Sequence, residues 1–230
     1  MAQDSTAFIR PISLPSDRSA LDHIFRVTCG ESLKTEPSWT ISSYLWCHPY
    51  PLLSPSTCFV LDPGNSEGPV GYILSTPNTR QFAKDWTEKY VPSLDRKLLP
   101  EPDVNVSEAV DDKPTQLLQL LYGDPEKALN FSYPGLVDTW PGHLHIDILP
   151  SHQGQGWGRK LIDTLLEALR AEGCKGVHLG MEAGSLGALK FYTKLGFSRY
   201  PEVLNGGVSG ETGRTGGEGP VLYLVKDILI

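Results

Sequence analysis

The residues from His143 to Tyr200 decide which fold this chain can adopt: HLHIDILPSHQGQGWGRKLIDTLLEALRAEGCKGVHLGMEAGSLGALKFYTKLGFSRY. In the middle of this stretch, apolar side chains recur every fourth residue at Trp157, Leu161, Leu165 and Leu169, with Ile162 and Leu166 beside them. This spacing predicts an amphipathic helix, and Gly173 is typical of the residue that ends one. The runs 145–149 and 177–181 predict a strand on each side of the helix. The order expected is therefore strand, glycine-rich turn, helix, strand and second helix.

The glycine-rich turn, QGQGWG at 153–158, lies where the first strand meets the helix. The first amide groups of a helix have no acceptor within it and the helix dipole is positive there, so an anion is stabilised. Glycines let phosphate oxygens approach the backbone closely, and Arg159 and Lys160 add positive charge. Taken alone, this run is equally compatible with a phosphate site and with an ordinary turn.

A second motif favours the phosphate site. The two motifs, in chain order, are Gln153-x-x-Gly156-x-Gly158 and Phe191-Tyr192 with Leu195-Gly196-Phe197. Together they resemble the GCN5-related N-acetyltransferase (GNAT) family of acyl-CoA-dependent N-acyltransferases. The resemblance implies an α/β fold, in which a central twisted, mixed and mostly antiparallel sheet of about six to seven strands is flanked by helices. It also implies one domain over residues 1–230 and acetyl-CoA as the co-substrate.

The resemblance assigns most cofactor contacts to the glycine-rich turn. It implies that the CoA pyrophosphate is bound by Gln153, Gly154, Gln155, Gly156, Trp157, Gly158 and Arg159. Backbone amides around Ile148, at the end of the preceding strand, are expected to bind the pantetheine arm and the thioester carbonyl. Ser185 and Lys190 are expected to add further contacts, and many family members carry Asn at the position of Ser185.

Asp147 is the residue that most directly suggests chemistry. It lies in a strand whose other members, at 146, 148 and 149, are apolar, and an unpaired carboxylate is costly to bury there. We expect Asp147 to accept a proton from the acceptor ammonium or to anchor it, because perturbed carboxylates collect at catalytic sites. The alternative is a structural carboxylate satisfied by His143 or His145.

Tyr192 matches the family tyrosine that protonates the departing thiolate, a role that suits a phenol because it is both a donor and an acid. The alternative is a core tyrosine beside Phe191. The candidate substrate-binding residues are His143, His145, Asp138 and Trp140. Two histidines at positions i and i+2 do not by themselves make a metal site, so no metal is expected.

Residues 76–140 form a long insertion compared with a minimal acetyltransferase, and a span of this length inside a compact domain is usually functional. The runs GYILSTPNTRQFAKDW and HLHIDILPSHQGQGWGRKL resemble the acetyltransferase-like domain at the C-terminus of O-GlcNAcases. They also resemble stand-alone fungal and bacterial relatives, some of which act on glucosamine. This narrower resemblance implies an amino sugar as the acceptor. Candidate aromatic contacts for a sugar are Trp86, Tyr90, Tyr133 and Trp140, with Asp138 nearby.

Three functions follow from these resemblances. The first is an acetyl-CoA-dependent N-acetyltransferase acting on a small primary amine, with glucosamine or a related amino sugar as the first choice. The second is a protein lysine acetyltransferase, which would need a stronger base because lysine is more basic than an amino sugar. The third is a catalytically silent acetyl-CoA-binding module, against which the presence of both Asp147 and Tyr192 argues.

The composition narrows the class of partner. The chain of 230 residues has a formal net charge of −7, which argues against nucleic acid and fits a cationic amine. Its four cysteines show neither metal nor disulfide spacing. The N-terminus does not resemble a signal peptide and no apolar run is long enough for a bilayer, so a cytoplasmic protein without a membrane partner is expected. The family resemblance adds a homodimer to these expectations.

Shorter patterns complete the predicted element order. The expected strands are 8–12, 57–62, 70–75 and 221–225, and the expected helices are 17–28, 38–47, 79–90 and 116–122. The aromatic residues Trp39, Tyr44 and Trp46 are assigned to the core rather than to a substrate wall, because aromatics at helical spacing are usually buried. The glycine-rich run 205–220 is expected to connect the last two strands.

Overall fold

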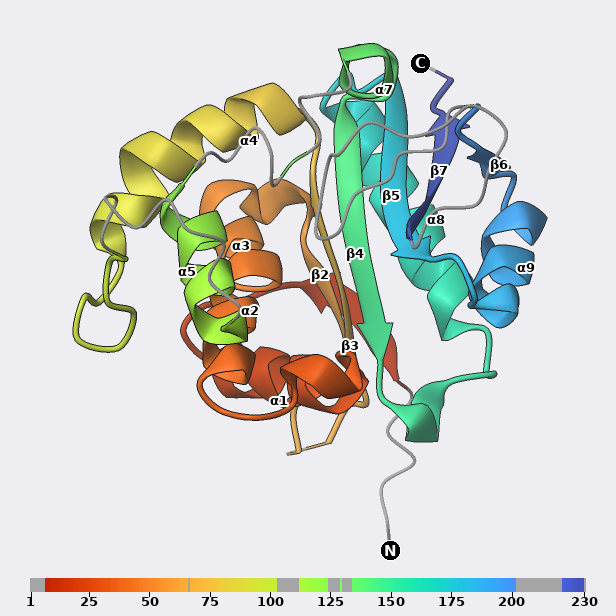
Figure 1. Ribbon diagram of the computed structural model, residues 1–230. Coiled ribbons are helices and arrows are strands. Elements are labelled where there is room, and N and C mark those ends of the chain that lie inside the picture. Colours follow the sequence, from red (N-terminus) through yellow and green to blue (C-terminus); the bar gives the residue numbers. More distant parts are fainter. Residues whose placement is uncertain are drawn as a thin grey trace, which may run out of the picture.

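A single mixed sheet forms the centre of the molecule (Figure 1). The structure is a computed structural model that describes residues 7–65, 67–102, 112–123, 129, 134–201 and 221–229. Seven strands lie in the order β1-β2-β3-β4-β5-β7-β6. Their bounds are β1 Phe8–Pro11, β2 Phe59–Asp62, β3 Gly71–Thr76, β4 Gly142–Ile148, β5 Gly176–Glu182, β6 Ser198–Arg199 and β7 Val221–Asp227. Neighbouring strands are antiparallel except β4 and β5, which are parallel. The predicted mixed, mostly antiparallel sheet is therefore confirmed.

Helices cover both faces of this sheet. The helices before β4 are α1 (Arg18–Thr28), η1 (Glu31–Leu33), α2 (Ser38–Trp46), α3 (Pro49–Leu53), η2 (Pro55–Thr57), α4 (Thr79–Asp85), the π-helix η3 (Trp86–Tyr90), η4 (Val91–Ser93), α5 (Lys113–Tyr122) and α7 (Pro134–Thr139). After β4 come η5 (Pro150–His152), α8 (Trp157–Ala171) and α9 (Leu186–Lys194). Helices α1 to α5 lie on one side of the sheet and α8 on the other (Figure 1). None of the described helices has both the length and the apolar character needed to cross a membrane.

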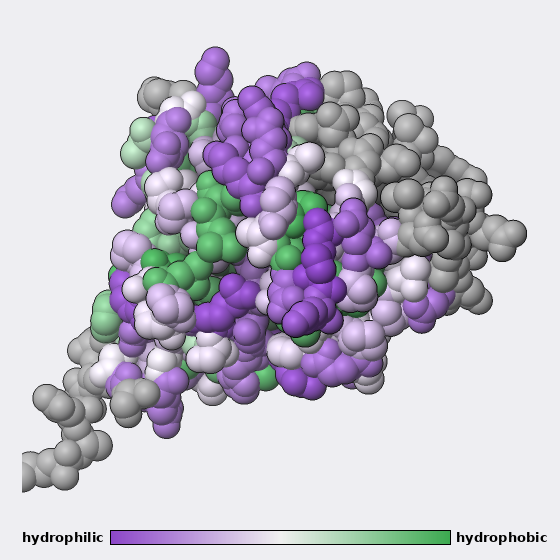
Figure 2. All heavy atoms as spheres, turned by 90° about the vertical axis from the view of Figure 1, so that its left-hand side faces the viewer, coloured by the Kyte–Doolittle hydropathy of each residue, from purple (hydrophilic) through white to green (hydrophobic). Residues whose placement is uncertain are grey.

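The insertion contributes to the first of these helical layers. Helix α5 packs against α2, so the residues of this helix extend the core. The outer surface of this layer is hydrophilic around a smaller apolar area (Figure 2). The expected helices at 79–90 and 116–122 are confirmed by α4 with η3 and by α5. Residue 133, most of the acidic run 101–113 and the connector 205–220 lie outside the described residues.

Side chains of the strands alternate between two hydrophobic cores. In β3, Tyr72 and Leu74 pack with the helices α1 to α5, whereas Ile73 packs with α8. Both sets are fully buried. This alternation is what a strand covered on both faces requires, and it means that the odd and even residues of the neighbouring β4 enter different environments.

Helix α8 has the amphipathic pattern expected from the sequence. Its buried residues are Leu161, Ile162, Leu165 and Leu169. Trp157 was predicted in the same stripe but is only half-buried, because it lies in the first turn with Lys160 Nζ 3.9 Å from its ring centroid. The predicted C-terminal glycine is confirmed: Gly173 has φ 72°, and Cys174 N donates to Leu169 O across the last turn.

Strands β4 and β5 pair only where they begin. Gly142 pairs with Val177 and His143 with His178, and no register pair follows. From there β4 continues to Ile148 with β3 as its partner. Over the second half of β4, the edge that faces β5 is therefore not paired with any strand of the described residues.

Two glycines permit the close contact at the start of these strands. A Cβ at Gly142 would lie 3.0 Å from Cys174 Sγ, and a Cβ at Gly176 would lie 2.5 Å from Trp140 Cδ1. The indole of Trp140 is held by a hydrogen bond from Nε1 to Asp227 and by an edge contact with Tyr200. It therefore has little freedom to move away from an added methyl group.

We predict that Gly176→Ala lowers the free energy of unfolding by about 1–3 kcal/mol, the usual cost of overpacking. Gly184→Ala is the matched control, because a Cβ there meets nothing within 4 Å. Urea unfolding of both variants measures the difference. Equal stability of the two variants would show that the start of β4 and β5 is not tightly packed.

Candidate active site

The N-terminus of α8 presents a backbone suited to an anion. Gly154 and Gly156 have φ values of 72° and 86°, which are left-handed conformations that glycine adopts without strain. Gly156 is the N-cap of α8, so the amides of the following turn have no acceptor within the helix. The helix dipole places partial positive charge at the same point.

These residues open into a cavity of about 640 Å³, which we call the glycine-loop cavity. Its lining residues are Ile146, Ile148, Gln153, Gly154, Gly156, Gly158, Arg159, Gly187, Ala188, Phe191, Tyr192, Lys194 and Leu195. A Cβ at Gly158 would lie 3.0 Å from Phe191 Cζ. The glycine therefore lets α9 approach the first turn of α8, and the cavity combines a cationic rim with an apolar wall.

The free edge of β4 leads into this cavity. The amide of Leu149 donates to Val70 O at 2.8 Å, towards the β3 side. Because successive amides of a strand point in opposite directions, the amides of Ile146 and Ile148 point towards β5, where pairing has ended. Gln153 Nε2 donates to Ile148 O at 2.7 Å and ties the turn to the strand. This edge offers donors to an extended polar ligand, as expected for Ile148.

Four residues predicted to bind cofactor do not line the glycine-loop cavity. Gln155 Nε2 donates to Ser151 O, and Trp157 lies under Lys160. Ser185 occupies the N-cap of α9, and Lys190 is exposed on that helix. Their contacts to a cofactor stay predictions, whereas the cavity itself is formed by the glycines, Gln153 and Arg159.

Asp147 lies on the opposite face of β4, in line with His143 and His145. Its carboxylate accepts a hydrogen bond of 2.7 Å from the hydroxyl of Tyr72, the residue opposite it in β3. Burial raises the pKa of Asp147 above its ordinary value, and the hydrogen bond from Tyr72 offsets part of that effect. A desolvated carboxylate with a raised pKa is a better proton acceptor than an exposed one.

Tyr192 projects from α9 into the glycine-loop cavity and is 9% exposed. It is flanked by the rings of Phe191 and Phe197. Burial raises the pKa of the Tyr192 phenol, and the charge of Asp147 raises it further. The phenol therefore keeps its proton at neutral pH and is able to donate it.

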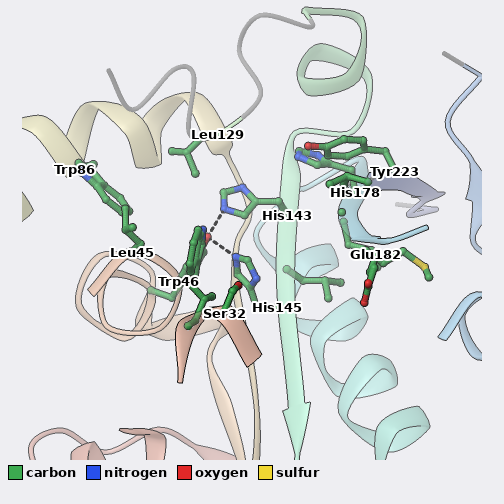
Figure 3. A pocket seen from close by; sticks show the side chains of 17 residues that line it. Ser32, Leu45, Trp46, Trp86, Leu129, His143, His145, His178, Glu182 and Tyr223 are labelled. Carbon is green, nitrogen blue, oxygen red and sulfur yellow. Dashed lines mark hydrogen bonds between the residues drawn. The ribbon is translucent and has the colours of Figure 1, made fainter. Parts of the chain in front are cut away.

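A second cavity, of about 580 Å³, lies beside the start of β4 and β5; we call it the histidine pocket (Figure 3). Its lining residues are Ser32, Leu33, Leu45, Trp46, Tyr50, Trp86, Leu129, His143, Leu144, His145, His178, Leu179, Gly180, Met181, Glu182, Val221 and Tyr223. Among these described residues there is no Lys or Arg, and Glu182 is the one carboxylate. The pocket therefore suits a neutral or cationic ligand.

The histidines of this pocket are uncharged at neutral pH. Burial, together with the nearby His178, lowers the pKa of His145 to about 4. Burial also lowers the pKa of His178 to about 4, although its hydrogen bond to Trp140 O acts in the opposite direction. Burial lowers the pKa of His143 well below its ordinary value. Each ring therefore offers one N–H donor and one bare nitrogen.

His143 and His145 were expected from the sequence, whereas their partners in the pocket were not. The hydroxyl of Tyr50 is hydrogen-bonded to both rings, at 2.8 Å from His143 Nε2 and 2.9 Å from His145 Nε2. Tyr50 lies in the run HPYPLL, and His178 lies in an apolar strand. Neither residue belongs to a recognisable sequence motif, because each comes close to β4 only when the sheet and helices have folded.

Two other candidate substrate residues do not line the histidine pocket. Asp138 is exposed and forms an ion pair with Arg80 at 2.6 Å. Trp140 donates to Asp227 and packs beside Tyr200. Helix α7 and the start of β4 thus carry the side chains of Asp138 and Trp140 away from this pocket.

The aromatic residues of the first helical layer divide between core and pocket. Trp86 and Tyr90 are each 2% exposed and donate to backbone carbonyls, so both belong to the core, although Trp86 also reaches the pocket wall. Trp39 and Tyr44 pack against the same core, as predicted. Trp46, predicted as core, is partly buried there and also lines the histidine pocket.

Comparison with known proteins identifies the fold and its chemistry. The solved structure described as SsHAT is 32% identical, aligned over 98% of this chain and 100% of that chain, with a TM-score of 0.77. The model of the acetyltransferase (GNAT) family matches residues 128–197, which include the glycine-rich turn and α9. The chain belongs to the GNAT acetyltransferase family. It is therefore an acyltransferase that uses acetyl-CoA for N-acetylation.

Curated relatives match over parts of their length. Mycothiol acetyltransferase of Gordonia bronchialis is 38% identical over 78 residues, 34% of this chain and 25% of the relative. Protein O-GlcNAcase of Rattus norvegicus is 26% identical over 145 residues, 63% of this chain and 15% of the relative. The matched part thus makes up a quarter or less of each relative. The activity of the whole relative is therefore not assigned to this chain.

The glycine-loop cavity fits the acetyl-CoA that the GNAT family uses. The left-handed glycines and the first turn of α8 suit a pyrophosphate, and the free edge of β4 suits the amides of the pantetheine arm. Acetyl-CoA supplies the acetyl group as a thioester. The cavity would hold it through Gly154, Gly156, Arg159 and the amides of Ile146 and Ile148.

We predict that Arg159→Gln weakens acetyl-CoA binding roughly three- to tenfold, because an exposed cation at a helix N-terminus contributes a modest electrostatic term. Lys160→Gln is the matched control: it removes the same charge one residue later, where the side chain lies over Trp157 and outside the cavity. Isothermal titration calorimetry at low ionic strength measures both. Equal losses in the two variants would mean that only the net charge matters.

Proposed function

We propose that this GNAT enzyme acetylates the primary amine of a small acceptor, with glucosamine or a related unphosphorylated amino sugar as the first choice. The observation that carries the proposal is the lining of the histidine pocket. Its described residues combine aromatic walls, uncharged imidazoles and one carboxylate, without a Lys or Arg. Such a surface accepts hydrogen bonds from hydroxyl and ammonium groups but offers no cationic partner to a phosphate.

Two further observations support an amino sugar. Asp147 does not line the pocket, but it lies on the same face of β4 two residues after His145, which does line it. An amine bound beside His145 would therefore lie one step along this face from a desolvated carboxylate. The partial similarity to Protein O-GlcNAcase also favours a sugar-related ligand. A lysine-containing peptide is the alternative acceptor, and the test below includes it.

The roles that we propose for the site residues account for both protons. Asp147 takes one proton from the acceptor ammonium, which leaves a neutral amine. As the new C–N bond forms and the C–S bond of the thioester breaks, Tyr192 donates its proton to the departing sulfur, and the resulting phenolate takes the second proton, which the nitrogen loses on becoming an amide. The amides of Ile146 and Ile148 orient the acyl donor along the edge of β4, and the apolar wall around Phe191 excludes water.

We predict acetyl-CoA-dependent thiol release with glucosamine, and at least tenfold lower kcat/KM with glucosamine 6-phosphate, because the phosphate dianion would be desolvated without a cationic partner. A thiol-reactive colorimetric assay with glucosamine, its 6-phosphate and a lysine peptide measures this. Thiol release with the peptide alone would overturn the amino-sugar proposal. Acetyl-CoA binding without turnover of any amine in a broad panel would show a silent binding module.

We also predict that Asp147→Asn and Tyr192→Phe each lower kcat at least a hundredfold, in the range typical of general acid–base residues, while the acetyl-CoA dissociation constant changes less than threefold. Stopped-flow turnover and calorimetric binding separate the two quantities. Leu189→Ala, which changes the packing of α9 at a residue that does not line the glycine-loop cavity, controls for disturbance of α9. Loss of acetyl-CoA binding in the Asp147 or Tyr192 variants would place these residues in structural roles.

A further inference from the structure

A chain of hydrogen bonds runs from the start of α4 through the two histidines of β4. Thr79 Oγ1 lies 2.7 Å from Pro141 O and 2.8 Å from His143 Nδ1. Tyr50 OH lies 2.8 Å from His143 Nε2 and 2.9 Å from His145 Nε2. Figure 3 shows the two imidazoles pointing from β4 towards the helices, with hydrogen bonds that meet at one hydroxyl.

The direction of this chain is fixed at its first link. The carbonyl of Pro141 can only accept, so the single hydroxyl proton of Thr79 must lie between the two oxygens. Without it, two lone pairs would face each other at 2.7 Å. The hydroxyl of Thr79 therefore accepts from His143, and His143 carries its proton on Nδ1.

The remaining links follow in order. A neutral His143 protonated on Nδ1 has a bare Nε2, so Tyr50 donates its proton there. The oxygen of Tyr50 is then an acceptor for His145, which must carry its proton on Nε2. Burial raises the pKa of Tyr50 and lowers that of both histidines, so each keeps the single proton that this order requires.

The end of the chain is a bare nitrogen in the histidine pocket. His145 lines this pocket, and no described residue is hydrogen-bonded to its Nδ1. Among the described side chains, Trp39 Nε1 is the one fully buried polar atom without a partner, so His145 Nδ1 is not sealed within the described protein. The neighbouring His178 is fixed differently, since its Nδ1 donates to Trp140 O.

We propose that Thr79 and Tyr50 hold His145 in the Nε2–H tautomer so that its Nδ1 accepts a hydrogen bond from the acceptor amine. This inference rests on the proposed function. It adds that an uncharged imidazole nitrogen recognises the amine by accepting a hydrogen bond from it. His145 precedes Asp147 by two residues on the same face of β4, about 7 Å along the strand. His145 thus positions the amine through an N–H group that the amine nitrogen keeps. Asp147 receives a proton that the same nitrogen loses. Thr79 and Tyr50 are positioning residues, and neither needs to touch the substrate.

The first test is spectroscopic and needs no substrate. Two-bond ¹H–¹⁵N correlation spectra distinguish protonated from bare ring nitrogens, and His143 and His145 should show opposite tautomers. Thr79→Val removes the first link, so the chain is free to reverse, and His145 should become partly or wholly protonated on Nδ1. Thr79→Ser keeps the hydroxyl and should retain the wild-type pattern. A wild-type His145 protonated on Nδ1, or tautomers that do not change in Thr79→Val, would overturn the proposal.

The second test uses whichever amine the enzyme acetylates. Thr79→Val should lower kcat/KM for the amine about five- to tenfold, the value of one hydrogen bond, with the KM for acetyl-CoA unchanged within twofold and Thr79→Ser close to wild type. His145→Gln, which replaces Nε2 but leaves nothing at Nδ1, should raise the KM for the amine. His145→Asn, which places a carbonyl oxygen near the Nδ1 position, should bring the KM for the amine part of the way back to the wild-type value.

The two tests separate this inference from the proposed function. If no amino sugar is acetylated but the tautomers are as expected, the choice of sugar fails and the hydrogen-bond chain stands. If an amine is acetylated and His145→Gln leaves its KM unchanged, the proposed contact of His145 with the amine is wrong.

Discussion

The separation of β4 from β5 after their first two residue pairs is the constraint on which the rest of the structure depends. Gly142 and Gly176 allow the strands to start in close contact, and among the described strands the following residues of β4 pair with β3 alone. A strand edge without a partner presents amides that need acceptors. In this enzyme, the edge lies between the glycine-loop cavity and the histidine pocket, where a ligand with several carbonyl groups can satisfy it.

Because the side chains of β4 alternate, its two faces have different roles. Ile146 and Ile148 line the glycine-loop cavity with α8 and α9, and His143, His145 and Asp147 face the layer of α1 to α5. Because the faces of a strand are separated by the sheet itself, the acyl donor and the amine are able to bind on different sides and meet at the open edge. The insertion supports the second face: α4 supplies Thr79, and α5 packs on α2.

Much of the first face could be predicted from the sequence, because it depends on local patterns. The period of four in 157–169 predicted the helix, and the glycines before it lie where the glycine-loop cavity opens. The second face could not be predicted in the same way. Tyr50 is 93 residues from His143 and meets it only after α3 packs against β3. Asp138 looked like a pocket residue by its position in the chain, yet its partner is Arg80, 58 residues away.

The most direct measurement of the central claim is residue-resolved amide hydrogen exchange with and without saturating acetyl-CoA. If the open edge of β4 binds the acyl donor, the amides of Ile146 and Ile148 should become strongly protected on binding. The amides of His145 and Asp147, which point towards β3, should be protected in both states. Saturating acetyl-CoA that leaves Ile146 and Ile148 exchanging as fast as in the free enzyme would contradict the account.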